Sequence, residues 1–120
     1  MDHPHRAAAE VLEKATRDIA ARRYDIAETR LTRLLRSAPD FAEAWHKRAT
    51  LYYLLTRDAE CLADIRRTLE LEPRHFCAML HFGELLFAGG ADEQARFAFH
   101  AALSLHPNLP RARRALSDKP

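Results

Sequence analysis

Apolar residues recur along the chain at spacings of three and four positions, in blocks separated by short polar or glycine-bearing breaks. This spacing places the apolar side chains on one face of a helix. The pattern predicts helices over residues 6–21, 25–37, 41–55, 59–71, 75–88 and 92–105, and a short seventh helix over 110–117. Breaks this short join antiparallel neighbours, so the expected fold class is all-α, with the helices in pairs.

Three prolines mark a period in this pattern. Pro39, Pro73 and Pro107 are 34 residues apart, and each closes a helical block because proline cannot continue a helix. A small residue stands twelve places before each proline and a large apolar residue eight places before it: Ala27, Cys61 and Ala95, then Leu31, Ile65 and Phe99. This register indicates tandem repeats. We expect one domain over residues 1–120, with repeats at about 8–41, 42–75 and 76–109, followed by the short helix 110–117.

Acidic residues stand at the expected start of each repeat's second helix. Asp25, Asp58 and Asp92 can accept hydrogen bonds from the free backbone N–H groups of a helix start. Asp40 and Glu43 have the spacing of a capping pair at the start of helix 41–55. The sequence therefore predicts side-chain caps at these helix starts.

The repeated positions resemble the pattern of the tetratricopeptide repeat (TPR) family. The second unit supplies Trp45, Arg48, Ala49, Tyr52, Cys61, Ile65, Thr68 and Pro73, and the third supplies Met79, Phe82, Gly83, Leu86, Ala95, Phe99, Ala102 and Pro107. The first unit departs most, because Lys14 and Asp18 stand where apolar residues are usual; polar residues suit the uncovered face of a terminal repeat. The chain is also similar to bacterial TPR proteins in stretches such as FAEAWHKRATLYYLL. The resemblance implies a right-handed superhelix of three antiparallel helix pairs with a capping helix.

The resemblance also implies a binding surface. In TPR proteins the first helix of each repeat lines a concave groove that takes a peptide or a helix. The groove residues implied here are Leu12, Thr16, Glu43, His46, Lys47, Thr50, Tyr53, Leu80, His81, Glu84 and Phe87. Tyr53, Leu80 and Phe87 are candidate apolar anchors. Relatives that hold the C-terminal carboxylate of a chaperone use basic and amide residues at places that read Leu12, Thr16, Lys47, Cys77 and His81 here, so that ligand is not expected.

Composition narrows the classes of partner. The net charge is +2, and acidic residues are interleaved with the arginines, so a nucleic-acid partner is not expected. No run of 18 apolar residues occurs, so no membrane partner is expected either. The start of the chain lacks the apolar core of a secretory signal. We expect a cytoplasmic protein, or a periplasmic one if a leader has been removed.

No catalytic motif is found in the sequence. It contains no glycine-rich phosphate loop, no GxSxG and no HExxH, and Cys77 with His81 lacks a third group to orient the pair. Glu43 with His46, and His81 with Glu84, have a spacing that can hold a metal, but a polar patch or a peptide contact is the favoured interpretation. We therefore expect no enzyme, no cofactor and no metal. On this view a fall in pH charges His46 and His81 and repels a basic ligand.

Two function classes remain open. The preferred one is an adaptor or scaffold that binds a peptide or helix in the groove, and the alternative is a small chaperone that shields an apolar segment of a secreted or assembling protein. A second surface is expected at Phe97, Phe99 and Leu103. Either the short helix 110–117 covers these residues or a second copy of the chain does, and the symmetric homodimer is slightly favoured.

Overall fold

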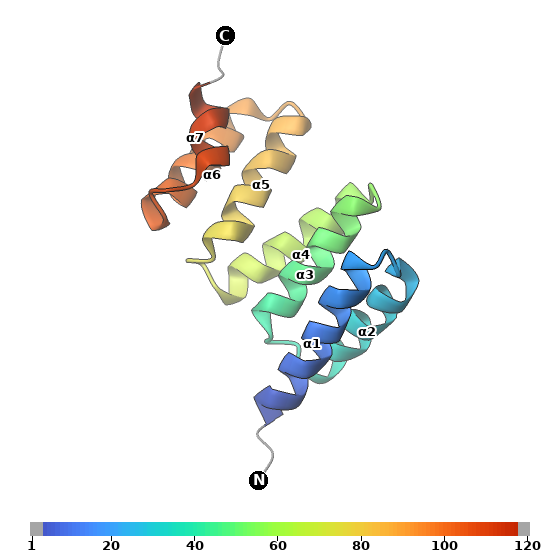
Figure 1. Ribbon diagram of the computed structural model, residues 1–120. Helices are drawn as coiled ribbons and strands as arrows, with labels where there is room; N and C mark the ends of the chain where they lie inside the picture. The colour runs from blue at the N-terminus through green and yellow to red at the C-terminus, as the bar shows by residue number, and fades with distance from the viewer. Residues whose placement is uncertain (1–3, 118–120) are drawn as a thin grey trace.

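The computed structural model describes residues 4–117, and all of the regular structure in that range is helical (Figure 1). The helices are α1 (Pro4–Ala20), α2 (Tyr24–Ser37), α3 (Ala42–Leu54), α4 (Asp58–Leu71), α5 (Phe76–Ala88), α6 (Asp92–Leu105) and α7 (Pro110–Ser117). Every predicted helix is present, and the ends differ from the predicted ones by at most two residues. The all-α class is confirmed.

The helices form antiparallel pairs stacked in a row. α1 packs against α2, α3 against α4 and α5 against α6, while α2–α3 and α4–α5 contacts join neighbouring pairs (Figure 1). α7 packs against α6 at the C-terminal end of the row. The molecule is elongated, with extents of 53 × 29 × 21 Å. This shape follows from the repeats, because each pair buries its apolar face only against its neighbours.

The residues in the 34-residue register form the core. Ala27, Cys61 and Ala95 are completely buried between the two helices of their pairs, where a larger side chain would force the helices apart. Leu31, Ile65 and Phe99 are buried beside them. The closest approach is at Gly83 of α5, where a Cβ atom would lie 2.8 Å from Cε1 of Phe99 on α6.

The predicted side-chain caps are wrong. The N-cap residues of α2, α3, α4 and α6 are Arg23, Phe41, Arg57 and Ala91, and none of their side chains accepts a capping hydrogen bond. Asp25, Asp58 and Asp92 lie inside the first helical turn, where a carboxylate still interacts favourably with the helix dipole. Among α2 to α6, the helix with a side-chain cap is α5, because Nδ1 of His75 accepts a hydrogen bond from the Ala78 N–H.

Asp18 differs from the expected solvent-exposed end-cap residue. Its carboxylate is buried and accepts hydrogen bonds from Arg23, at 3.1 Å, and from Arg30 of α2, at 2.7 Å. Lys14, by contrast, is exposed as expected. A buried carboxylate is tolerated where it is fully paired, and two guanidinium groups provide that pairing. No helix within residues 4–117 has the length and apolar character needed to cross a membrane.

Candidate functional site

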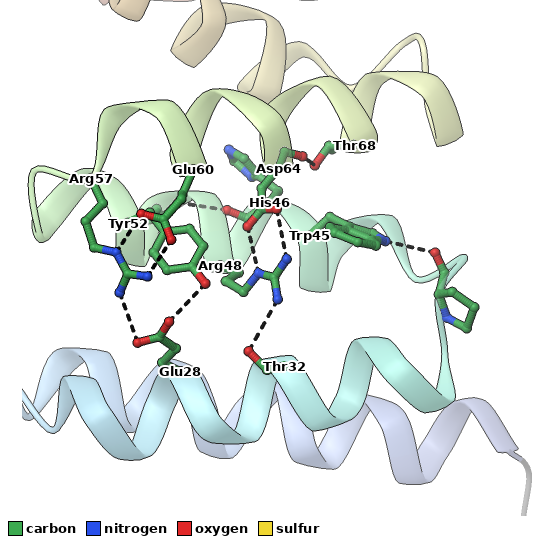
Figure 2. A network of polar contacts seen from close by, with 12 residues as sticks. Glu28, Thr32, Trp45, His46, Arg48, Tyr52, Arg57, Glu60, Asp64 and Thr68 are labelled. Carbon is green, nitrogen blue, oxygen red and sulfur yellow. Dashed lines mark hydrogen bonds and ion pairs between the residues drawn. The ribbon is translucent and has the colours of Figure 1, made fainter.

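A polar network fixes α3 against its two neighbours and so positions the residues on its other faces. Figure 2 shows Arg48 of α3 between Asp64 of α4 and Thr32 of α2. The guanidinium donates to both carboxylate oxygens of Asp64, at 2.7 and 3.0 Å, and to the Thr32 hydroxyl at 3.3 Å. The hydrogen bond to Asp64 raises the pKa of Arg48. A bidentate pair of this kind has a fixed geometry, so it joins α3 to α4 within the second repeat and orients Arg48, whose contact with Thr32 reaches the first repeat.

The same junction contains a second set of contacts from α3 to α2. The Tyr52 hydroxyl donates to Glu28 at 3.0 Å, and Arg57, which precedes α4, donates to Glu28 and Glu60 (Figure 2). Glu28 therefore joins the first repeat to two residues of the second. With Arg48, these contacts leave α3 little freedom to shift relative to α2.

A hollow of about 490 Å³ lies between α3 and α5. It is lined by His46, Thr50 and Tyr53 from α3, by Cys77, Leu80, His81 and Glu84 from α5, and by Arg111 from α7. Most of these are groove residues implied by the TPR resemblance. Arg111 was missed, because it lies beyond the third repeat, where the register gives no guide. It donates to the Glu84 carboxylate through Nε, at 2.9 Å, and through Nη2.

The other expected groove residues lie outside this hollow. Leu12 packs into the core between α1, α2 and α3, and the exposed Thr16 donates its hydroxyl to the Leu12 carbonyl. Lys47 is half-buried, and the exposed Glu43 pairs with His75.

Leu80 lines the hollow but does not project into it as a free anchor. It is 6% exposed and packs against Phe99, so it forms part of the wall.

Two histidine rings, His46 and His81, line the hollow, and a third, His75, packs against His46. The ring centroid of His46 lies 4.8 Å from that of His75 and 5.9 Å from that of His81, both edge-on. Tyr53 stacks edge-on against His81, at 5.0 Å. Since Nδ1 of His75 accepts the Ala78 N–H, the neutral ring carries its proton on Nε2 and donates it to Glu43. No hydrogen bond to the His46 or His81 ring comes from residues 6–117.

Burial keeps two of these rings uncharged. Desolvation, together with the neighbouring His75 and His81, lowers the pKa of His46 to about 4. Desolvation also lowers the pKa of His81. The expectation that mild acid charges His46 is therefore wrong, because this ring stays neutral until the pH approaches 4. Burial raises the pKa of the Cys77 thiol, so it remains protonated at neutral pH.

Large apolar side chains lie exposed at the C-terminal ends of α3 and α5. Tyr53 is 50% exposed, Leu54 49% and Phe87 55%. Tyr53 and Phe87 occupy the same place in successive repeats, so they project from neighbouring parallel helices. We call these three residues the apolar rim. The rim and the hollow together form a surface that can take an apolar segment and hydrogen-bond to it. In the part of the chain that the structure describes, no group of three or more histidine, cysteine or acidic residues is placed to hold a metal ion.

Of the three residues expected at a subunit interface, one is exposed and two are covered by α7. Phe97 is 79% exposed on α6. Phe99, however, is 2% exposed and lies in a cluster with Ala112 of α7, and Leu103 packs against the same cluster. Phe99 thus faces the protein's own core, because the short C-terminal helix supplies the cover that the third repeat needs.

The chain was compared with family models and with known proteins. No family model matches the chain, but a protein with the same kind of repeat does. It is 30% identical over 97 residues to a TPR repeat-containing protein of Rhizobium etli, an alignment that covers 81% of this chain and 48% of that protein. The chain thus spans about half the length of this relative.

Two solved structures show the same fold. The first TPR of Spaghetti (RPAP3), bound to the HSP90 peptide SRMEEVD, matches with a TM-score of 0.86 and 24% identity, over 92% of this chain and 87% of that one. The O-GlcNAc transferase of Thermobaculum terrenum matches with a TM-score of 0.85 and 26% identity, over 97% of this chain and 22% of that one. With the 34-residue register and the paired helices, these likenesses show that the chain is a tetratricopeptide-repeat protein.

Proposed function

We propose that the protein is an interaction module, not an enzyme, and that it binds a segment of another polypeptide between α3 and α5. The observation that carries this proposal is the apolar rim of Tyr53, Leu54 and Phe87, exposed beside a hollow whose polar lining includes the side chains of His46 and His81 and the Glu84–Arg111 ion pair. Neighbouring exposed aromatic side chains are typical of binding surfaces, since covering them removes apolar area from water.

The chemistry of the hollow argues against catalysis. The Cys77 thiol has a raised pKa and is protonated at neutral pH, and the lowered pKa of His81 makes it a weak base. The carboxylate of Glu84 is engaged by Arg111. A nucleophile needs an activated form and a partner that orients its base, and these residues supply neither.

An acidic chaperone tail is a poor match for this surface. The HSP90 peptide held by RPAP3 ends in the acidic sequence EEVD. Here Glu84 lines the hollow and Glu43 lies beside it on α3, and the neutral His46 and His81 add no positive charge. A segment with apolar residues for the rim is better matched, and we expect the peptide SRMEEVD to bind at least tenfold more weakly than peptides selected on the protein itself.

A peptide-display selection on the purified protein tests the proposal. Selected peptides are then measured against the double variant Tyr53→Ala/Phe87→Ala and against Phe97→Ala, which removes a still more exposed aromatic residue from α6. Loss of two central aromatic contacts should weaken binding at least tenfold, while Phe97→Ala should leave it unchanged. Equal effects of the two variants, or no selected peptide, would contradict the proposal.

The same selection separates the adaptor from the chaperone alternative. An adaptor selects peptides that share a motif with fixed spacing, because specific contacts distinguish partners. A chaperone that shields apolar segments selects peptides related by hydrophobicity alone. The apolar rim serves both functions, so the presence or absence of a motif decides between them.

A further inference from the structure

Two imidazole rings in the hollow have no hydrogen-bond partner among residues 6–117. His81 is 8% exposed, and its ring forms part of the hollow's lining. His46 is half-buried opposite it, on α3. The neighbouring polar groups are already engaged: His75 with Ala78 and Glu43, and Thr50 with the backbone carbonyl of His46.

A ligand that covers the hollow has to satisfy these two rings. A neutral imidazole carries one N–H donor and one unprotonated nitrogen that accepts. If a purely apolar side chain fills the space, the rings lose water and gain nothing in return, which weakens binding. The ligand group that fits therefore both donates and accepts hydrogen bonds.

The charges around the rings disfavour a charged ligand group of either sign. The titratable and charged groups that face the two rings are Glu43, Lys47 and Tyr53 on α3, His75 at the N-cap of α5, Cys77 and Glu84 on α5, and Arg111 on α7. Glu84 and Arg111 neutralise each other, and Glu43 and Lys47 carry opposite charges. A charged ligand group of either sign would therefore lose its hydration in the hollow without an unpaired opposite charge to meet it.

We propose that the bound segment places the carboxamide of an asparagine or glutamine in the hollow, against both His46 and His81, while its flanking apolar residues cover the rim. The carboxamide oxygen accepts from the N–H of one ring, and its NH₂ donates to the unprotonated nitrogen of the other. The two rings are edge-on neighbours with centroids 5.9 Å apart, and both line the hollow, so one small group there can contact both. This inference rests on the proposed function and specifies the ligand of that same site.

The test uses the peptides selected on the full chain. The expected result is one position at which asparagine or glutamine is enriched, with apolar residues near it. Synthetic peptides that carry Asn, Asp, Leu or Lys at that position are compared by fluorescence anisotropy. We expect each replacement of Asn to weaken binding about tenfold, the usual effect of one lost hydrogen bond or one misplaced charge.

Histidine variants connect the preference to these rings. His81→Gln retains a donor and an acceptor and should keep the preference for Asn over Leu, whereas His81→Phe should abolish it. His46→Phe and His46→Gln give the same comparison at a less buried position, and circular dichroism checks that each variant is folded. Wild-type affinity for the Asn peptide should not rise as the pH falls from about 8 to about 7, because burial lowers the pKa of both rings and favours their neutral forms in this range.

The outcomes separate this inference from the proposed function. Selection of acidic or basic residues at the position, or an Asn preference that survives in both phenylalanine variants, overturns the inference and leaves binding at the rim intact. Acid-enhanced binding of the Asp peptide also overturns it, since that result requires a charged imidazole. If no selected peptide is sensitive to Tyr53→Ala/Phe87→Ala, the proposed function fails and the inference fails with it.

Discussion

At the scale of single residues, the first two repeats each bury a carboxylate that pairs with an arginine. The two repeats differ in which helix of the pair carries the carboxylate and which carries the arginine. Asp18 lies on the first helix of its pair and Arg30 on the second, whereas Arg48 lies on the first helix and Asp64 on the second. The third repeat has the apolar Phe82 and Ala98 at the places of Arg48 and Asp64. The fold therefore does not require a charge pair at these places.

Removing one partner of the buried pair should be more harmful than removing both. Arg48→Met leaves the Asp64 carboxylate, which is 3% exposed, without its bidentate partner. We expect the free energy of unfolding to fall by about 3 kcal/mol, as when a buried ion pair is broken from one side. Urea denaturation at neutral pH measures this change.

Two comparisons complete that experiment. The double variant Arg48→Met/Asp64→Leu should recover most of the lost stability, because no buried charge remains unpaired. Arg66→Met, on the exposed face of α4, should change stability by less than about 0.5 kcal/mol. If Arg48→Met behaves like Arg66→Met, the ion pair does not contribute as argued.

His46 should make the protein sensitive to acid. Its pKa is about 4 in the folded protein, against 6.5 for a solvent-exposed histidine in an unfolded chain. Between these values the unfolded chain binds more protons, so stability falls as the pH drops from 6.5 to 4. The full loss from this group is on the order of 3 kcal/mol, and His46→Gln should remove that part of the pH dependence.

Urea denaturation at neutral pH and near pH 4.5 measures the effect. The matched control is His100→Gln, which replaces an exposed histidine on α6. It should leave the pH dependence as in the wild type. Identical pH profiles for His46→Gln and the wild type would contradict the assignment of acid sensitivity to the buried ring.

At the scale of helices, the contact of α5 with α6 depends on the absence of a side chain at Gly83. Alanine is a better helix former than glycine by about 1 kcal/mol. The added Cβ would, however, lie 2.8 Å from the Phe99 ring, which is 2% exposed, so the ring or the two helices would have to shift within the core. We expect Gly83→Ala to destabilise the protein by about 1–2 kcal/mol, measured by thermal or urea denaturation.

Gly89 provides the matched control for this substitution. A Cβ at Gly89 would make ordinary contact with the Leu85 carbonyl at 3.5 Å, so Gly89→Ala should be nearly neutral. Shortening the opposing ring in Gly83→Ala/Phe99→Leu should destabilise less than the sum of the two single changes. Additive effects would show that the two residues do not compete for the same space.

The turn within each repeat explains why the sequence predicted the helices but not their N-cap residues. The residues with positive φ are Arg22, Thr56 and Gly90, 34 residues apart, one in the turn between the two helices of each repeat. Glycine is the usual signal for this conformation, and only the third repeat carries it. Helix positions were predictable from the apolar spacing. The N-caps were not, because these turns leave the capping place to residues without a suitable acceptor.

At the scale of the whole molecule, α7 closes the C-terminal end of the stack. Ala112 is completely buried in the cluster with Leu80 and Phe99. Ala112→Glu places a charge in that cluster, and we expect it to lower the free energy of unfolding by about 3 kcal/mol and to promote association through the uncovered residues. Urea denaturation and light scattering measure the two effects.

The exposed Arg114 of the same helix serves as the control. Arg114→Glu should leave stability and mass unchanged. Because α7 covers Phe99 and Leu103, we expect the wild type to scatter light as a 13.8 kDa monomer. A wild-type dimer at micromolar concentration that Phe97→Asp dissociates would show that the remaining exposed ring is sufficient for association.

The repeat register predicted the stack, and the TPR resemblance implied much of the hollow's lining, but neither predicted the chemistry of the hollow. His46, Tyr53 and His81 were expected at the groove and do line it. Arg111 could not be found in this way, since it lies outside the repeats and reaches Glu84 through the fold of the tail. The neutral state of His46 was also out of reach, because it depends on burial that a periodic pattern does not quantify.

The polar network between α2 and α3 makes the order of the repeats non-interchangeable. If the second repeat were duplicated and stacked on itself, the copied Arg48 would meet Arg66 in place of Thr32, and the copied Tyr52 hydroxyl would face Leu62 in place of Glu28. Like charges and an unpaired hydroxyl would then meet at the seam. The side chains at each junction therefore match only the repeats that meet there. A longer array would need different side chains at every new junction.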